Sequence, residues 1–149
     1  MVIVTPNTDH YIEKFKDKTF LGLDDIASEN IIFTEEKSSL RTYLDTSIIE
    51  KEISFDSFLE FGNVESTKKL VKYGFGIAIL PFLSILDEVK AKKLKYFKIK
   101  GLNVTRKILL LSLKEKQFSD STTLFINYLK NNLKEFIESE GNEDLLKIL

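Results

Sequence analysis

Two serines and an arginine stand close together in the segment EEKSSLR, residues 35–41. The apolar residues before it predict a strand that ends at Thr34, and a helix is expected to begin within the segment. Hydroxyls and backbone N–H groups at a helix N-terminus form a small-anion site, to which Arg41 adds a bidentate contact for a carboxylate. Ser38, Ser39 and Arg41 are therefore candidate ligand-binding residues. The alternative is that a serine only caps the helix and that Arg41 is solvated.

Two further turns have a comparable design. In FGNVES, Asn63 and Val64 follow a phenylalanine-rich strand and open a helix, although Asn63 is also a good N-cap with no ligand role. Pro81 ends a third apolar strand, GIAILP, and Phe82 follows it. Ligands of open α/β sheets bind beyond the carboxyl ends of the strands, and parallel strands share that edge. The three turns together therefore predict a ligand cleft.

Other kinds of chemistry lack the residues that they need. The chain has no cysteine and one histidine, His10, so a thiolate or histidine metal site and a Ser-His-Asp triad are not expected. The segment GFGIA follows a helix rather than a strand, which argues against a dinucleotide fingerprint. We predict no catalytic residue, no metal and no cofactor, and an enzyme would need a catalytic cluster that the sequence does not assemble.

Charge and hydropathy limit the partners. Lys and Arg number 22 against 23 Asp and Glu, a net charge of −1, which argues against a phosphate-binding surface on this chain. The lysine run over 90–98 fits a solvated helix end joined to an edge strand better than it fits a nucleic-acid contact. No apolar run approaches the ~20 residues of a membrane span, and the start lacks a signal-peptide layout. These features predict a cytoplasmic protein.

The elements that must position the three turns follow from hydrophobic periodicity. After a polar loop over 5–18, strands and helices alternate, which predicts an α/β fold with a largely parallel sheet covered on both faces. Gly74 is expected to end a helix in the left-handed conformation, and Gly76 to allow a tight turn into a buried strand. The expected strands are 2–5, 30–34, 55–61, 76–81, 95–101 and 106–114, and the expected helices are 23–29, 40–49, 63–73, 82–94 and one from 119 to about 139.

With these residues in view, the sequence resembles the effector-binding domain of LysR-type transcriptional regulators. The segment FGNVESTKKLVKYGFGIAILP is similar to the family's helix followed by Gly-x-Gly-Ile and proline, and VTPNTDH, LDDIASENIIF and TRKILLLSLKEKQFSDSTTLFINYLK resemble other family segments in the same order. The similarity runs from about residue 2 to 132. Tyr11 and Asn30 stand where the family has proline, KSSLR lacks the family's glycines, and Val64 replaces a common threonine.

The resemblance implies a fold of two α/β lobes, like the type 2 periplasmic binding proteins. Residues 6–106 would be the second lobe, and residues 1–5 and 107–149 would be crossing strands and a C-terminal amphipathic helix that belong to a mostly missing first lobe. The chain is therefore expected to be a truncated fragment. Without its usual partner, the apolar stripe of the helix over 119–138 is expected to drive homodimerisation.

The resemblance also implies a function, which is to sense a small effector for a transcriptional regulator. The effector would be a small, anionic metabolite bound in a cleft between lobes, and the isolated chain is expected to bind it weakly or not at all. DNA would be contacted only through a winged-helix domain that this chain lacks, and no membrane partner is expected. The alternative is a stand-alone solute-binding protein of the same fold, which would need a signal peptide or a lipid-anchor cysteine.

Overall fold

The structure is a computed structural model, in which the chain forms two compact units, Met1–Val104 and Thr105–Leu149. Each unit is described by itself. The described residues are 1–35, 39–50, 54–55, 57–101, 110–113, 115 and 117–139.

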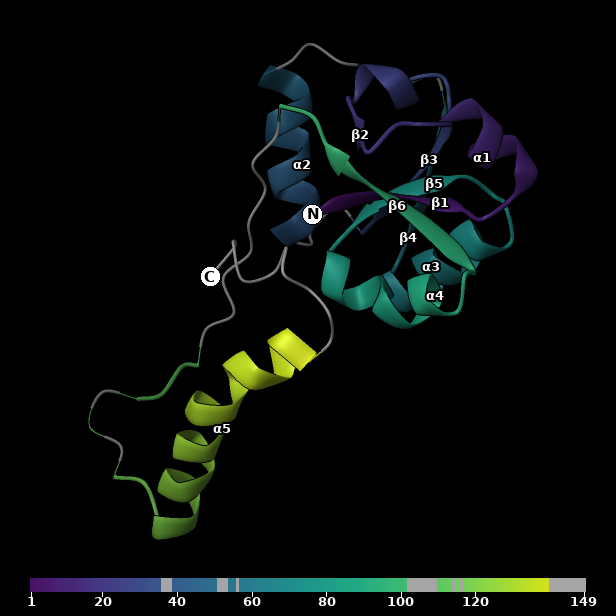
Figure 1. The fold of residues 1–149 in the computed structure, drawn as a ribbon. Coiled ribbons are helices and arrows are strands. Elements are labelled where there is room, and N and C mark those ends of the chain that lie inside the picture. Colours follow the sequence, from purple (N-terminus) through teal and green to yellow (C-terminus); the bar gives the residue numbers. More distant parts are fainter. Residues whose placement is uncertain are drawn as a thin grey trace. The chain divides into compact units, whose positions relative to one another are not determined.

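Strands and helices alternate along the first unit (Figure 1). Among its described residues, the second unit contributes one long helix. In chain order the elements are β1 (Val2–Pro6), α1 (Asp9–Lys14), β2 (Phe20–Leu21), the 3-10 turn η1 (Asp24–Ile26), β3 (Asn30–Thr34), α2 (Ser39–Glu50), β4 (Ser57–Phe61), α3 (Val64–Lys72), β5 (Ile77–Leu80), the 3-10 turn η2 (Phe82–Ile85), α4 (Leu86–Lys90), β6 (Leu94–Ile99) and α5 (Asp120–Ser139).

The six strands form one sheet in the order β2-β6-β1-β5-β3-β4. The pairs β3 with β4, β3 with β5 and β2 with β6 are parallel, whereas β1 runs antiparallel to both of its neighbours. Val2 pairs with Leu80 on one side and with Lys98 on the other, so β1 lies in the middle of the sheet. The prediction of a largely parallel sheet is confirmed, with one reversed strand.

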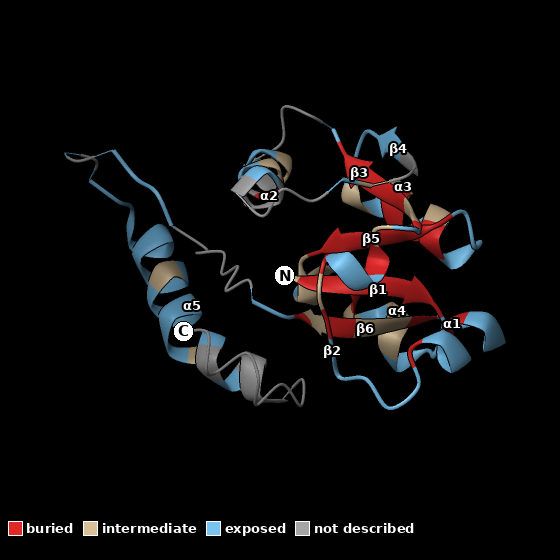
Figure 2. Cartoon of the chain, turned by 90° about the horizontal axis from the view of Figure 1, so that it is seen from above, coloured by how far each residue is buried: buried red, intermediate tan, exposed pale blue. Residues whose placement is uncertain are grey.

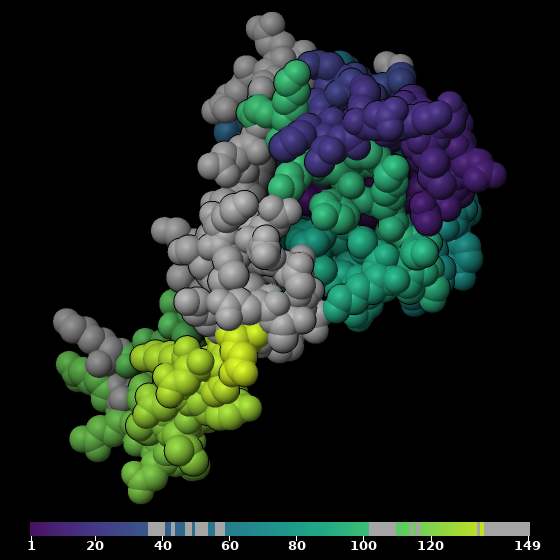
Figure 3. Space-filling view, in the orientation of Figure 1, coloured from purple at the N-terminus to yellow at the C-terminus, as the bar shows by residue number. Residues whose placement is uncertain are grey.

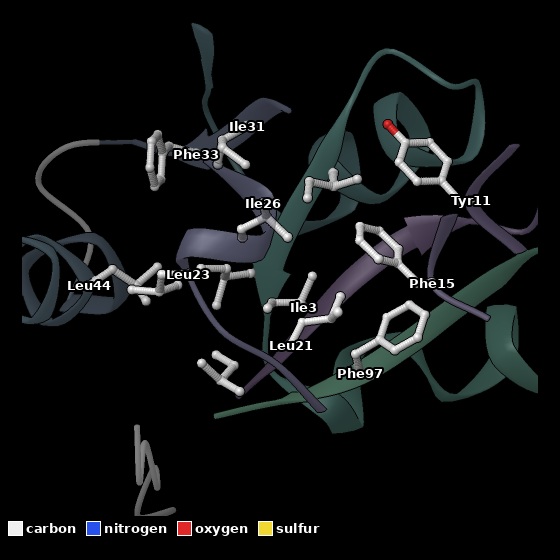
Figure 4. Packing of buried hydrophobic residues seen from close by; sticks show 13 residues of the cluster. Ile3, Tyr11, Phe15, Leu21, Leu23, Ile26, Ile31, Phe33, Leu44 and Phe97 are labelled. Carbon is white, nitrogen blue, oxygen red and sulfur yellow. The ribbon is translucent and has the colours of Figure 1, made fainter. Parts of the chain in front are cut away.

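Alternate residues of the strands point to two separate hydrophobic clusters, one on each face of the sheet. Ile3 and Ile31 belong to the first cluster, together with side chains from α1, η1 and α2 (Figure 4). Val4 and Ile32 belong to the second cluster, which α3, η2 and α4 cover. The strands between the two layers carry most of the buried residues (Figure 2). This pattern is that of a sheet covered by helices on both faces.

The polar loop predicted over 5–18 is wrong, because part of it is the helix α1. Tyr11 and Phe15 are four residues apart, which places both rings on the same side of the chain and into the first cluster. The Phe15 ring lies edge-on to Phe97 of β6, with 5.4 Å between the centroids (Figure 4). In the space-filling view the purple N-terminal segment accordingly lies against the green residues of β6 (Figure 3).

A buried carboxylate fixes α1 to the segment before β3. The Tyr11 hydroxyl donates to Glu29 Oε2 at 2.9 Å, and the Lys14 ammonium donates to Glu29 Oε1. Burial alone would raise the pKa of Glu29, but the hydrogen bonds from Lys14 and Tyr11 and the charge of Lys14 outweigh it and lower the pKa. Burial also raises the pKa of Tyr11, and its bond to Glu29 adds to that effect. Tyr11 thus has a structural role.

The lowered pKa of Glu29 predicts a loss of stability in acid. The folded state favours the carboxylate, so the stabilisation is present above the unfolded pKa of about 4.3 and is lost as the pH falls through the folded value. Replacing Glu29 with glutamine is expected to cost about 1 kcal/mol at pH 7 and progressively less below about pH 4. Urea unfolding across this pH range measures the difference. The control is Glu13→Gln, because Glu13 is exposed on the same helix. A difference in the free energy of unfolding between the unsubstituted chain and Glu29→Gln that stays constant at all pH values would contradict the prediction.

Two glycines follow α3. The N–H groups of Gly74 and Phe75 donate to the carbonyls of Val71 and Leu70, a Schellman cap, and Gly74 has the expected left-handed φ of 82°. Gly76 is buried, and a Cβ atom placed there would overlap the carbonyl oxygen of Asn30. The role predicted for Gly74 is therefore confirmed, and Gly76 allows two backbone segments to meet.

The helix α5 of the second unit begins where the sequence predicts. Ser119 Oγ accepts a hydrogen bond from the backbone N–H of Thr122 at 3.3 Å, as an N-cap does. Within the described part of α5, the apolar side chains Leu124, Phe125, Tyr128, Leu129 and Leu133 are exposed. The strand predicted over 106–114 is absent from residues 110–113, and most of its other residues lie outside the described ranges. No helix among the described residues is long and apolar enough to cross a membrane.

Candidate functional site

The carboxyl ends of β3, β4 and β5 lie at one edge of the sheet, because the three strands are parallel and adjacent. Three turns leave from this edge. Ser39 is the first residue of α2, Asn63 caps α3, and Pro81 precedes η2. Ser38, the remaining serine of the first turn, lies outside the described residues. The fold therefore brings the three predicted turns to a common edge, where ligands of open α/β sheets bind.

Arg41 is held by two acidic residues and an aromatic ring. Its Nε donates to Asp45 Oδ1 at 2.7 Å, one turn along α2, and its Nη1 lies 3.8 Å from Glu60 Oε2 of β4. The guanidinium carbon lies 4.4 Å from the centre of the Phe33 ring. Only 14% of the Arg41 side chain is exposed. The alternative that Arg41 is merely solvated is therefore wrong.

Sequence reasoning missed both acidic partners of Arg41. Asp45 was detectable, since an Arg and an Asp four residues apart on a helix face each other. Glu60 was not, because its position depends on the pairing of β3 with β4, which sets Phe33 opposite Glu60. That register places the two side chains on the same face of the sheet as α2. The site therefore combines one cation with two anions.

The second turn is a helix cap. Asn63 Oδ1 accepts from the backbone N–H of Ser66 at 2.9 Å, and the Asn63 carbonyl accepts from the N–H and the hydroxyl of Thr67. The capping interpretation of Asn63 is thus confirmed. Val64 packs against the second hydrophobic cluster, on the face of the sheet opposite Arg41. Of this turn, Asn63 itself is exposed at the edge.

The third turn is rigid. The carbonyl of Pro81 accepts from both the N–H and the hydroxyl of Ser84, at 3.0 and 2.7 Å. Phe82 packs on the second cluster, with its ring 4.7 Å from that of Tyr96. The predicted site residues therefore share an edge but not a face, because Val64 and Phe82 lie on the α3 side and Arg41 on the α2 side.

A nearly buried lysine holds the second and third turns together. Lys68 Nζ donates to Glu65 at 2.8 Å, to Glu88 at 3.0 Å and to the Ser84 carbonyl at 2.8 Å. Burial alone would lower the pKa of Lys68, but the hydrogen bonds to Glu65 and Glu88 outweigh it and raise the pKa. Lys68 therefore stays charged and ties α3 to η2 and α4. The sequence offers no signal for this burial, since Lys68 stands in a charged helical run.

These contacts define what the edge can do. A guanidinium, helix N-termini and exposed polar groups suit hydrogen-bonding and charge recognition of a small ligand. Among the described residues no group of three or more His, Asp or Glu side chains is placed to hold a metal ion.

Comparisons with known proteins point to one family. The profile of the LysR substrate binding domain matches residues 1–134. The chain is 27% identical over 128 residues to a probable RuBisCO transcriptional regulator of Phaeodactylum tricornutum, covering 84% of this chain and 41% of that protein. It is 33% identical over 73 residues to the HTH-type transcriptional regulator YwqM of Bacillus subtilis, covering 49% of this chain and 25% of that protein. The chain thus spans less than half the length of these relatives.

Solved structures share the fold. The effector-binding domain of QuiR in complex with shikimate superposes with a TM-score of 0.65 at 25% identity, over 85% of this chain and 57% of that one. The regulatory domain of CcmR from Synechocystis PCC6803 in complex with 2-PG also gives a TM-score of 0.65, at 22% identity, over 86% of this chain and 60% of that one.

Proposed function

The chain belongs to the LysR substrate binding domain family, and from that membership we propose that its sheet edge senses a small, anionic metabolite for a transcriptional regulator. The family and its neighbours are effector-binding domains of regulators rather than enzymes. The solved neighbours named above were crystallised with shikimate and with 2-PG, both small molecules. The observation that carries the proposal is the meeting of the three strand-to-helix turns at the edge that holds Arg41.

The proposal assigns ligand contacts to the residues of these turns. Arg41 would bind a carboxylate, and the backbone groups at the starts of α2 and α3 would bind other acceptors. Within the family's two-lobe fold, residues 6–106 would form the second lobe and the remainder would belong to the first. A winged-helix segment of the same regulator would contact DNA in the cytoplasm. The proposed contact residues are Ser38, Ser39, Arg41, Asn63, Val64, Pro81 and Phe82.

Amide chemical-shift mapping with shikimate tests the proposal. Because the chain would supply only one of the two lobes, we expect binding near the millimolar range, and the amide shifts should be confined to residues 39–41, 60–64 and 82. Arg41→Gln is expected to weaken binding about tenfold, since it removes a charge-assisted contact. Lys72→Gln is the control, because Lys72 is exposed at the far end of α3. Thermal unfolding of each variant reports whether it remains folded. Amide shifts confined to residues away from the edge would refute the site. So would an Arg41→Gln variant that binds shikimate as tightly as the unsubstituted chain does.

We also propose that the chain forms a homodimer through the helix over 119–138. The exposed apolar side chains of α5 support this, since monomeric proteins seldom expose large contiguous apolar patches. Replacing Leu124 and Tyr128 with glutamate is expected to convert a dimer into a monomer. Light scattering after size exclusion measures the mass, and a monomeric unsubstituted chain would contradict the proposal.

A further inference from the structure

Among the described residues, Arg41 and its two acidic partners together carry a net charge of −1 beside the Phe33 ring. Arg41 contributes +1, and Asp45 and Glu60 contribute −1 each. Asp45 accepts a hydrogen bond from Nε at 2.7 Å, whereas the 3.8 Å between Nη1 and Glu60 is an ion pair without a hydrogen bond. Any anion that reaches this guanidinium therefore meets two carboxylates at close range.

The two acids differ in their relation to solvent and to Arg41. Asp45 lies on the same helix as Arg41, and its bond to Nε keeps the side chain over the Phe33 ring. Glu60 comes from a different element, the edge strand β4, and 40% of its side chain is exposed. Arg41 itself is only 14% exposed. A ligand that pairs with Arg41 would therefore lie within reach of Glu60.

A carboxylate acts only as an acceptor, so Glu60 repels a bare anion and attracts a hydrogen-bond donor. We propose that Glu60 is a specificity-determining residue, and that the site takes a carboxylate whose neighbouring carbon bears a hydroxyl or an ammonium group. The ligand carboxylate pairs with Arg41, and the adjacent donor pairs with Glu60. This inference rests on the proposed function and adds to it the class of effector, an α-hydroxy or α-amino acid. Selection arises from repulsion of the wrong ligand as well as attraction of the right one.

Lactate, alanine and propionate test the inference, because they share a three-carbon carboxylate and differ in the group on the α carbon. In amide chemical-shift titrations of the whole chain, lactate or alanine should bind at least fivefold more tightly than propionate. Glu60→Leu should remove that preference and strengthen propionate binding. Glu60→Gln keeps a hydrogen-bond acceptor but no charge. It should therefore abolish a preference for alanine over propionate and retain part of a preference for lactate. This variant distinguishes an α-amino acid effector from an α-hydroxy acid effector.

The control is Glu13→Gln, which should leave all three affinities unchanged. Glu13 lies on α1, which follows the carboxyl end of β1, and β1 runs antiparallel to β5, so α1 leaves from the edge of the sheet opposite the three turns. Equal binding of the three acids at the edge, or a preference that Glu60→Leu leaves intact, would overturn the role of Glu60 while the proposed function stands. If none of the three acids, and not shikimate either, shifts the amides of the edge, the proposed function fails and this inference fails with it.

Discussion

Replacing Gly76 with alanine is expected to lower the free energy of unfolding by about 3 kcal/mol. A Cβ atom at this position would overlap the carbonyl oxygen of Asn30 and lie 3.3 Å from Cγ1 of Ile32. Both neighbours belong to β3, which pairs in register with β5, and backbone yields far less easily than a flexible side chain. The two strands would have to separate at the start of their ladder.

The neighbouring glycines provide matched controls for Gly76→Ala. Gly62→Ala should change stability by less than about 0.5 kcal/mol, since no atom beyond the adjacent residues lies within 4 Å of its Cβ position. Gly74→Ala should cost about 1 kcal/mol, because its φ of 82° strains any side chain although the space is open. Urea unfolding of the three variants measures their free energies of unfolding and so ranks the three substitutions by cost. A cost at Gly76 no greater than that at Gly74 would contradict the close approach to β3.

Replacing Phe97 with alanine is expected to cost about 3 to 5 kcal/mol, the range found for buried aromatic residues. Phe97 is 1% exposed and lies in the first hydrophobic cluster, where its ring contacts Phe15, the C-cap residue of α1 (Figure 4). The cavity would lie between the sheet and α1, two rigid elements that cannot close it fully.

Phe20 is the matched control for Phe97, because it is the same residue on the adjacent strand and is 54% exposed. Phe20→Ala should cost less than about 1 kcal/mol. The midpoints and slopes of urea unfolding measure both variants. If the two alanine variants proved equally stable, the packing of α1 on the sheet would be wrong.

Local patterns in the sequence predicted the strand-to-helix turns correctly. The apolar runs ending at Thr34 and Leu80 are buried strands, Asn63 is an N-cap, and Gly74 ends α3, because each depends on residues near in sequence. The turns meet at one edge because parallel strands share a direction, which alternation of strands and helices already implies.

Features that depend on distant pairing were not predictable. The reversed direction of β1 arises from its pairing with β5 and β6, and the contact of Arg41 with Glu60 arises from the register of β3 with β4. The helix α1 is not of this kind. The spacing of Tyr11 and Phe15 is typical of a helix, but the many polar residues around them favour a loop.

The central place of β1 has a consequence for how the chain acquires its structure. The strand β1 pairs with β5 and β6, whose partner residues follow more than 70 positions later. Closing so long a loop before any ladder forms is slow, so we expect folding of the sheet to wait until β6 has been synthesised. Until then the apolar segment Val2–Val4 has no partner strand within the sheet and is open to chaperone binding or to aggregation.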